Sequence, residues 1–247
     1  MKNRVTHASL FGLPYSRFLT QDASLLPLDS LRKRNAYIHI YSYARAALPG
    51  FEETSQHIII INLRHSLEDI FDAFKKNTRN EIRKTENIPE LTFSIPDRKN
   101  RDSYRFYTAI KKRDGVTPDA YIEFRGCLFF NAYYKGKMIV SVSCYDTGEI
   151  LRLKHIVSER KNPSFDATLI GYATRRVMWE LCKYGKERGY STIDLAGANV
   201  SEANKSGITA FKQSFGGELK EIWVYRSKTP AFRWAQKGAH MFGKNIH

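Results

Sequence analysis

The sequence predicts a mixed α/β protein in which one sheet holds antiparallel and parallel strands. Three strand-like segments follow one another between residues 127 and 158, separated by hairpin signals at 135–137 and 146–148. A long helical segment and a further strand come next, which is the order of a parallel crossover connection. With 42% hydrophobic residues in a chain of 247, there is enough apolar material for a substantial core.

The segments before these strands are less regular. Residues 1–35 contain Pro14 and Pro27 as breakers, and we interpret them mostly as loop with short helical pieces. Residues 36–44 alternate as a half-buried strand does, and residues 57–63 indicate a fully buried strand.

A basic helix is predicted over residues 66–89. Ser66 is a good N-cap residue, and Asp69 stands at the capping-box position. An apolar stripe with a period of 3.6 residues runs along this segment, while cations occupy the other faces of its C-terminal half. The stripe consists of Leu67, Ile70, Phe71, Phe74, Thr78 and Ile82.

The elements around and after the three strands can be placed by their caps. A helix opens at Asp102, and the longest helix runs from Asp166 to a stop at Gly189. We expect the strand at 193–195 to pair parallel to the last strand of the meander. The remaining segments are a short helix near 206–215, a strand at 218–226 and a basic aromatic helix or tail at 229–247.

Charge and cysteine content narrow the class of protein. The net charge of +15 attracts phosphates, which RNA, nucleotide-linked substrates and anionic membrane surfaces all carry. Three cysteines without a CxxC spacing argue against a disulfide framework and a cysteine zinc site. No apolar run is long enough for a signal peptide or a membrane span, so we expect a soluble cytoplasmic protein that contacts the inner face of the membrane at most peripherally.

Three ordered segments carry a family resemblance: FKKNTRNEIRKTEN before the three strands, KERGYSTIDLAG after the long helix, and GITAFKQSFGGELKE after that. With these segments the chain resembles the Fem-type branch of the GNAT acyltransferase superfamily. The resemblance covers roughly residues 50–225 and implies an α/β, GNAT acyl-CoA N-acyltransferase-like fold. The implied organisation is a reduced N-terminal region (1–65) packed on the main domain, a basic connecting helix (66–89) and a GNAT-like acyltransferase domain (90–247).

The chain departs from the Fem-type pattern in two ways. Complete Fem proteins carry two GNAT-like domains, whereas the first is reduced here, and some members carry a coiled-coil arm that this sequence lacks. A third absence fits the resemblance. The glycine pattern with which ordinary GNAT enzymes hold a pyrophosphate at a helix N-terminus is absent from 158–171. Fem-type proteins generally lack that pattern too.

Lys212 is the predicted catalytic residue. Acyl transfer to an amine passes through a tetrahedral oxyanion, which a fixed cation stabilises. The resemblance implies that Lys212 supplies this cation and that Phe211 shapes the acceptor pocket. Gly216 and Gly217 would let the backbone approach the substrate closely. In the alternative interpretation, Ile208, Phe211 and Phe215 form the core face of an ordinary helix and Lys212 is solvated.

Two residues are candidates for proton transfer, and the sequence leaves the choice between them open. His155 shares a predicted strand face with Leu151, Leu153 and Val157, and it is either a base beside the substrate or a satisfied core histidine. Asp194 ends a strand, where it either orients the amine or caps the following loop.

Arg79, Arg83 and Lys84 are the predicted phosphate binders. Arg79 and Arg83 lie one turn apart and could together hold a diphosphate. A solvated basic helix face is the alternative, because cations near a helix C-terminus need no ligand.

The predicted function is an N-acyltransferase. It moves an acyl or aminoacyl group to the primary amine of a phosphate-bearing cell-envelope precursor, either a nucleotide-linked amino sugar or a muropeptide. Acyl-CoA or aminoacyl-tRNA would be a co-substrate, with no tightly bound cofactor, no metal and no DNA partner. The alternatives are an aminoacyl-tRNA-dependent peptidoglycan peptidyltransferase and a non-catalytic RNA-binding protein, the latter because residues 226–247 contain no acid.

Overall fold

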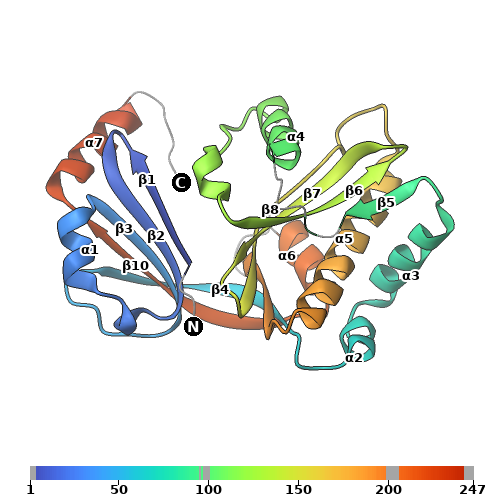
Figure 1. The fold of residues 1–247 in the computed structure, drawn as a ribbon, viewed down its shortest axis with the longest axis horizontal. Helices are drawn as coiled ribbons and strands as arrows, with labels where there is room; N and C mark the ends of the chain where they lie inside the picture. The colour runs from blue at the N-terminus through green and yellow to red at the C-terminus, as the bar shows by residue number, and fades with distance from the viewer. Residues whose placement is uncertain (1–3, 95, 97–100, 199–205, 242–247) are drawn as a thin grey trace. The chain divides into compact units, whose positions relative to one another are not determined.

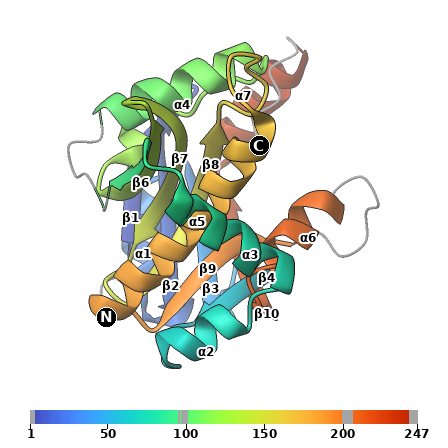
Figure 2. The same ribbon diagram turned by 90° about the vertical axis from the view of Figure 1, so that its right-hand side faces the viewer.

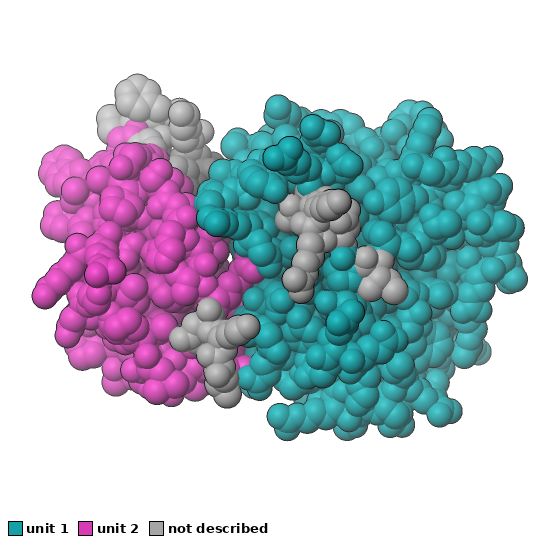
Figure 3. Space-filling model, in the orientation of Figure 1, with its two compact units in different colours: residues 1, 57–220 teal, residues 2–56, 221–247 magenta. Residues whose placement is uncertain are grey.

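The structure, a computed structural model, describes residues 4–94, 96, 101–198 and 206–241 (Figure 1). Its ten strands form one mixed sheet in the order β1-β2-β3-β10-β4-β9-β8-β7-β6-β5, which confirms the predicted fold class. Contacts divide the chain into two compact units (Figure 3): unit 1 contains residues 57–220, and unit 2 contains residues 2–56 and 221–247. The predicted division at 65 and 89 has other boundaries and stays a prediction.

Unit 1 places helices on both faces of its strands (Figures 1 and 2). Helices α5 and α3 cover one face over the main hydrophobic core, and α4 covers the opposite face over a smaller aromatic core. Its elements are α2 (Leu67–Asp72), α3 (Lys76–Lys84), β5 (Leu91–Ser94), α4 (Arg101–Arg113), β6 (Cys127–Tyr134), β7 (Lys137–Asp146), β8 (Ile150–Ser158), α5 (Ala167–Glu187), β9 (Thr192–Gly197) and α6 (Ser206–Gln213), with short 3-10 turns at Thr85–Asn87 and Tyr121–Phe124.

Unit 2 contains the β1-β2-β3-β10 end of the sheet and one hydrophobic cluster among the described residues. Its elements are β1 (Arg4–Leu10), β2 (Leu13–Asp22), a 3-10 turn (Ala23–Leu25), α1 (Leu28–Arg34), β3 (Tyr37–Ala44) and α7 (Pro230–Met241). Strands β4 (Glu52–Asn62) and β10 (Glu218–Lys228) contribute residues to both units. Phe18, Ile38, Ile40 and Tyr225 are among the buried members of the cluster.

The predicted strand pairing is confirmed. β6, β7 and β8 pair antiparallel in sequence order, and β8 pairs parallel to β9 from Ile150 and Thr192 to Arg152 and Asp194. The crossover is α5, whose first N–H groups are capped by Asp166 through a 2.8 Å bond from the Thr168 amide.

The interpretation of residues 1–35 as mostly loop is wrong, because β1 and β2 form a hairpin there. Pro14 does not break the strand, because it is the second residue of β2, a position near the strand start where proline is tolerated. Pro27 stands at the N-cap of α1, where proline begins a helix rather than interrupting one.

The single helix predicted over 66–89 is two helices. Ser66 and Asp69 form the expected capping box of α2, but Lys75 adopts an extended conformation between α2 and α3 and donates its amide to the Ser214 carbonyl at 2.9 Å. Ile70, Phe74, Thr78 and Ile82 are nevertheless buried, so the predicted stripe keeps its core-facing role on both sides of the break.

Candidate functional site

The parallel strands β8 and β9 part just beyond Arg152 and Asp194, the last pair in their register. At the same point β9 bulges against β4, because Asp194 faces Ile60 while Gly197 faces Ile58. Ala196 lies in this bulge with a φ of 61°, which is uncommon for a residue other than glycine. Several polar groups gather around the bulge.

Asp194 anchors the bulge from within. Its side chain is fully buried, accepts a hydrogen bond from the Arg152 guanidinium, and accepts a second from the Ala196 amide at 2.6 Å. These two contacts fit the alternative interpretation, in which Asp194 caps the loop that follows its strand. A role of Asp194 in orienting an amine stays a prediction.

Lys212 reaches the same bulge from α6. Only 9% of the residue is exposed, and its Nζ donates a 2.6 Å hydrogen bond to the Gly197 carbonyl. Burial lowers the pKa of Lys212 to about 8; nearby Asp194 opposes this shift and Arg152 adds to it. The alternative of a solvated surface lysine is therefore wrong.

The buried face of α6 differs from the one that its apolar spacing predicted. Ile208 is 64% exposed, whereas Thr209 and Lys212 are buried beside Phe215. Phe211 is half-buried, with its ring centroid 5.0 Å from that of Phe215 in an edge-on arrangement. The helix thus turns its lysine inward, a choice that hydrophobic periodicity could not reveal.

The two glycines after α6 have a packing role that corrects the expected one. A Cβ on Gly216 would overlap the backbone of Ala73, and one on Gly217 would overlap Ile59 and Ile60. Gly216 also has a φ of 65°. The close backbone approach that the Gly-Gly pair permits is therefore made to α2 and β4, and an approach to substrate stays a prediction.

His155 lies on the opposite face of β8 from the one predicted. Ser143 pairs with His155 and Cys144 pairs with Leu153, so Lys154 is an extra residue in a β-bulge. Leu151 and Leu153 consequently belong to the main core under α5, while Val157 belongs to the aromatic core under α4. The expectation that all four side chains share one face is wrong because the bulge changes the alternation.

The same bulge lets two consecutive side chains meet one carboxylate. Asp119 Oδ2 lies 2.6 Å from Lys154 Nζ and 2.9 Å from His155 Nε2. Lys154 also donates to the Tyr145 hydroxyl at 2.9 Å, and the Asp119 amide donates to the Tyr107 hydroxyl at 3.0 Å. Asp119, Lys154 and Tyr145 were not predicted from the sequence, because Asp119 sits in a loop 35 or 36 positions away from its partners.

The electrostatics of this cluster hold His155 neutral and Asp119 ionised. Burial lowers the pKa of His155 more than its bond to Asp119 raises it. Burial would raise the pKa of Asp119, but the hydrogen bond from His155 and the Lys154 ammonium outweigh it and hold that pKa well below its usual range. A neutral His155 that donates Nε2–H to the carboxylate keeps a free lone pair on Nδ1.

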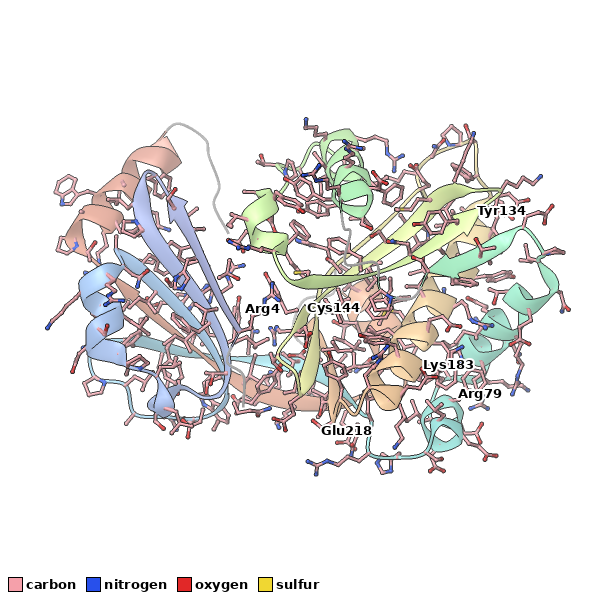
Figure 4. The ribbon with its side chains drawn as sticks, viewed as in Figure 1. Arg4, Arg79, Tyr134, Cys144, Lys183 and Glu218 are labelled. Atoms are coloured by element: carbon pink, nitrogen blue, oxygen red, sulfur yellow. The ribbon has the colours of Figure 1, made fainter. Side chains whose placement is uncertain are left out.

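The predicted phosphate binders lie on α3, with Arg79 beside α2 (Figure 4). Arg79 donates through NH1 to the carbonyls of Asp72 and Phe74, so it caps the C-terminus of α2. Arg83 lies 5.4 Å from the centre of the Phe71 ring, and Lys84 bonds the Tyr172 hydroxyl at 3.2 Å. Phosphate binding by these residues stays a prediction, and Arg79 would have to exchange its carbonyl partners for it.

Within the described part of the chain, no group of three or more histidine, cysteine or acidic side chains could hold a metal ion. Cys127, Cys144 and Cys182 are buried, and none of the three forms a disulfide bond. Across the same residues, no helix is long and apolar enough to span a bilayer.

Comparison with known proteins identifies the fold. No family model and no curated protein matches the sequence. Among solved structures, FemX is similar over 96% of this chain and 86% of its own, with 12% identity and a TM-score of 0.60. The chain shares the fold of FemX. The resemblance inferred from the sequence is thus confirmed at the level of fold.

Two further structures share this Fem-type fold. The C-terminal domain of a protein described as a lysylphosphatidylglycerol synthetase, from Agrobacterium fabrum, has a TM-score of 0.58 at 10% identity and covers 97% of this chain and 85% of that domain. L-PGS from Bacillus licheniformis has a TM-score of 0.56 at 12% identity, with coverages of 99% and 90%. At such identities the likeness concerns the fold alone.

Proposed function

We propose that this protein is an acyltransferase that moves an acyl or aminoacyl group from a thioester or ester donor to the primary amine of a phosphate-bearing acceptor. The observation that carries the proposal is Lys212, a buried ammonium held at the point where β8 and β9 part. Burying a lysine without a carboxylate bonded to it costs free energy, and charged residues buried at such a cost are common in functional sites.

Lys212 would stabilise the oxyanion of the tetrahedral intermediate. Its bond to the Gly197 carbonyl uses one of the three ammonium protons and fixes the direction of the others. A fixed donor at an oxyanion contributes about 3–4 kcal/mol to the transition state.

His155 would act as the base. The acceptor amine forms a bond to the donor carbonyl carbon, and Nδ1 of the neutral His155 takes the proton that the nitrogen releases. The intermediate then collapses, the C–S or C–O bond breaks, and the leaving thiolate or alkoxide receives that proton. Asp119 holds the ring through Nε2 and is a positioning residue in this scheme.

The donor and the acceptor are proposed as classes. One structural neighbour is named for lysylphosphatidylglycerol, a lipid that carries an aminoacyl group and a phosphate. That name supports an aminoacyl donor and a phosphate-bearing acceptor, with acyl-CoA as the other donor. Nucleotide-linked amino sugars, muropeptides and lipid headgroups are the acceptor classes to compare.

A non-catalytic RNA-binding protein is the second candidate, favoured by the net charge of +15 and the acid-free segment 226–247. It would display its lysines on an open surface. The burial of Lys212 supports the enzyme instead.

The test is an assay of group transfer. Purified protein is incubated with acetyl-CoA or with lysyl-tRNA, together with a nucleotide-linked muropeptide, a nucleotide amino sugar or phosphatidylethanolamine, whose headgroup carries a primary amine, and products are read by mass spectrometry. We expect an acylated product in one arm with the wild type and loss of that product with Lys212→Met. Tight RNA binding that Lys212→Met leaves unchanged, with no product in any arm, would favour the RNA-binding protein.

A further inference from the structure

Unit 2 contains a cavity of about 390 Å³ to which the proposed acyl transfer gives no role. Its volume lies within the range of about 300–1,000 Å³ that small-molecule sites occupy. Its described lining contains four cationic side chains and one carboxylate. The cations are Arg226, Lys228, Arg233 and Lys237, and the carboxylate is Glu52.

Strand and helix periodicity bring the four cations together. Arg226 and Lys228 alternate with Tyr225 along β10, and Tyr225 is buried in the hydrophobic cluster of unit 2. The two cations therefore project from the other face of the strand. Arg233 and Lys237 are four residues apart on α7, so they share one side of that helix.

The positive charge of this cavity is not neutralised by the protein. Arg226 donates to the Thr54 hydroxyl at 3.0 Å, and Lys228 donates to the Gln236 side-chain carbonyl at 3.0 Å. Neither partner carries a charge. Across the described residues, none of the four cations is within ion-pair distance of a carboxylate. Four like charges around one hollow repel one another, and an anion would relieve that repulsion.

The walls of the cavity are fixed by contacts that involve no carboxylate. Gly50 has a φ of 76°, and the adjoining turn is held by Arg32, whose guanidinium donates to the Pro49 carbonyl and lies 4.8 Å from the centre of the Phe51 ring. On the other side, α7 is anchored by Phe232, which is 2% exposed and has its ring centroid 4.7 Å from that of Tyr37. The elements that carry the cations are thus held in place before any ligand arrives.

We propose that this cavity is a binding site for a diphosphate group, carried either by a small water-soluble compound or by a lipid. A diphosphate offers several anionic oxygens at once, which suits two arginine forks and two ammonium groups. Glu52 in the lining would repel a further anionic group and favours a ligand whose neighbouring group donates hydrogen bonds. The site does not depend on the proposed acyl transfer, since all its residues lie in unit 2.

The first test is calorimetric titration of the full chain with inorganic pyrophosphate. We expect the double variant Arg233→Gln/Lys237→Gln to bind at least ten-fold more weakly than the wild type. Both side chains are exposed, so the fold should be retained. The matched control is Lys33→Gln/Arg34→Gln, which removes two exposed cations from α1 and should change the affinity less than two-fold.

A third variant tests whether negative charge in the cavity weakens pyrophosphate binding. Glu52→Gln removes the one carboxylate among the described lining residues and should tighten pyrophosphate binding several-fold, because it removes repulsion at the site. Absence of pyrophosphate binding by the wild type, or an equal loss in the α1 control, would overturn the proposal.

Vesicles then separate the two sources of the diphosphate. If the ligand is lipid-borne, the wild type should cosediment with vesicles containing a lipid diphosphate in phosphatidylcholine, and pyrophosphate should displace it. If the ligand is a free compound, the same vesicles should not retain the protein although pyrophosphate binds. Vesicle retention that neither pyrophosphate nor Arg233→Gln/Lys237→Gln reduces would count against the site.

Discussion

Lys154 and Lys212 are two lysines of unit 1 with buried side chains, and the pKa values of their ammonium groups are shifted in opposite directions. The Lys154 side chain is 4% exposed and lies 2.6 Å from the Asp119 carboxylate. Lys212 is 9% exposed, and its hydrogen bond goes to a backbone carbonyl. Although burial lowers the pKa of both, Tyr145 and Asp119 raise that of Lys154 above its ordinary value, whereas that of Lys212 falls to about 8.

The difference shows that the charge of the bonded partner decides what a buried lysine can do. A carboxylate at 2.6 Å compensates Lys154 and leaves it a structural ion-pair member. The carboxylate nearest Lys212 is already bonded to Arg152, so Lys212 keeps an incompletely satisfied charge. An additional anion, such as an oxyanion, would therefore be stabilised more strongly beside Lys212 than beside Lys154.

The largest expected effect is the loss of turnover in Lys212→Met. Methionine keeps most of the packing of the lysine stem and removes the charge, so kcat should fall about 100-fold or more while KM stays within a few-fold. Steady-state kinetics with the substrates found in the transfer assay would measure this. The matched variant Lys154→Met should retain most of its turnover, and equal losses in the two variants would remove the distinction between the lysines.

The next effect is a rise of stability with pH that Lys212 should produce and Lys154 should not. Below about pH 8 Lys212 is protonated in the folded and unfolded states, but between about 8 and 10.5 the folded protein releases the proton first. The unfolded chain then binds more protons, so stability should rise with pH in this window.

We expect the wild type to gain up to about 3 kcal/mol relative to Lys212→Met between pH 7 and pH 10. Urea unfolding of both proteins at each pH gives this difference and cancels the titration of other groups. A constant difference across the window would mean that the pKa of Lys212 is not lowered.

A smaller effect is expected when the carboxylate beside Lys154 is neutralised. Asp119→Asn leaves the Lys154 ammonium buried without its counter-charge, and because the Asp119 side chain is 37% exposed, water should replace part of what is lost. We expect a loss of about 1–2 kcal/mol in the free energy of unfolding.

The double variant Asp119→Asn/Lys154→Met provides the control for that loss. It removes both charges and should be more stable than Asp119→Asn alone, since no unpaired ammonium remains. Strictly additive losses in the two single variants would contradict an ion pair in this cluster.

The smallest effect concerns Lys154→Met and His155. The Lys154 ammonium contributes to lowering the pKa of His155, so its removal should raise that pKa while stability changes by less than about 1 kcal/mol. NMR titration of the His155 ring measures the shift directly. If His155 is the base, the acid limb of the kcat profile should move to higher pH by the same amount, and an unmoved limb would assign proton transfer to another group.

Most elements from residue 36 onward, and the parallel pairing of β8 and β9, could be predicted from local patterns and caps, but strand β5 was not. Residues 4–22 could not, because β2 places Pro14 and its polar residues between two partner strands and the apolar alternation is weak there. The break between α2 and α3 at Lys75 could not be predicted from the sequence either. It depends on the carbonyl of Ser214, which is 139 positions away in the chain.

Within the candidate site, Lys212 was found through a family motif and His155 through its place on a strand. Their surroundings could not be found in the same way. Asp119 stands in an unremarkable loop, and its meeting with Lys154 and His155 requires a bulge that no sequence pattern marks. The inward turn of Lys212 likewise contradicts the apolar face of its own helix.

The bulge at Lys154 makes β8 sensitive to its length as well as to its composition. The residues before and after Lys154 are two half-strands in opposite phase, joined at one extra position. Removing that position would restore a regular alternation and would exchange the faces of everything on one side of it. A one-residue deletion here should therefore be more harmful than any single substitution in β8, and length at this point should be the feature least free to vary.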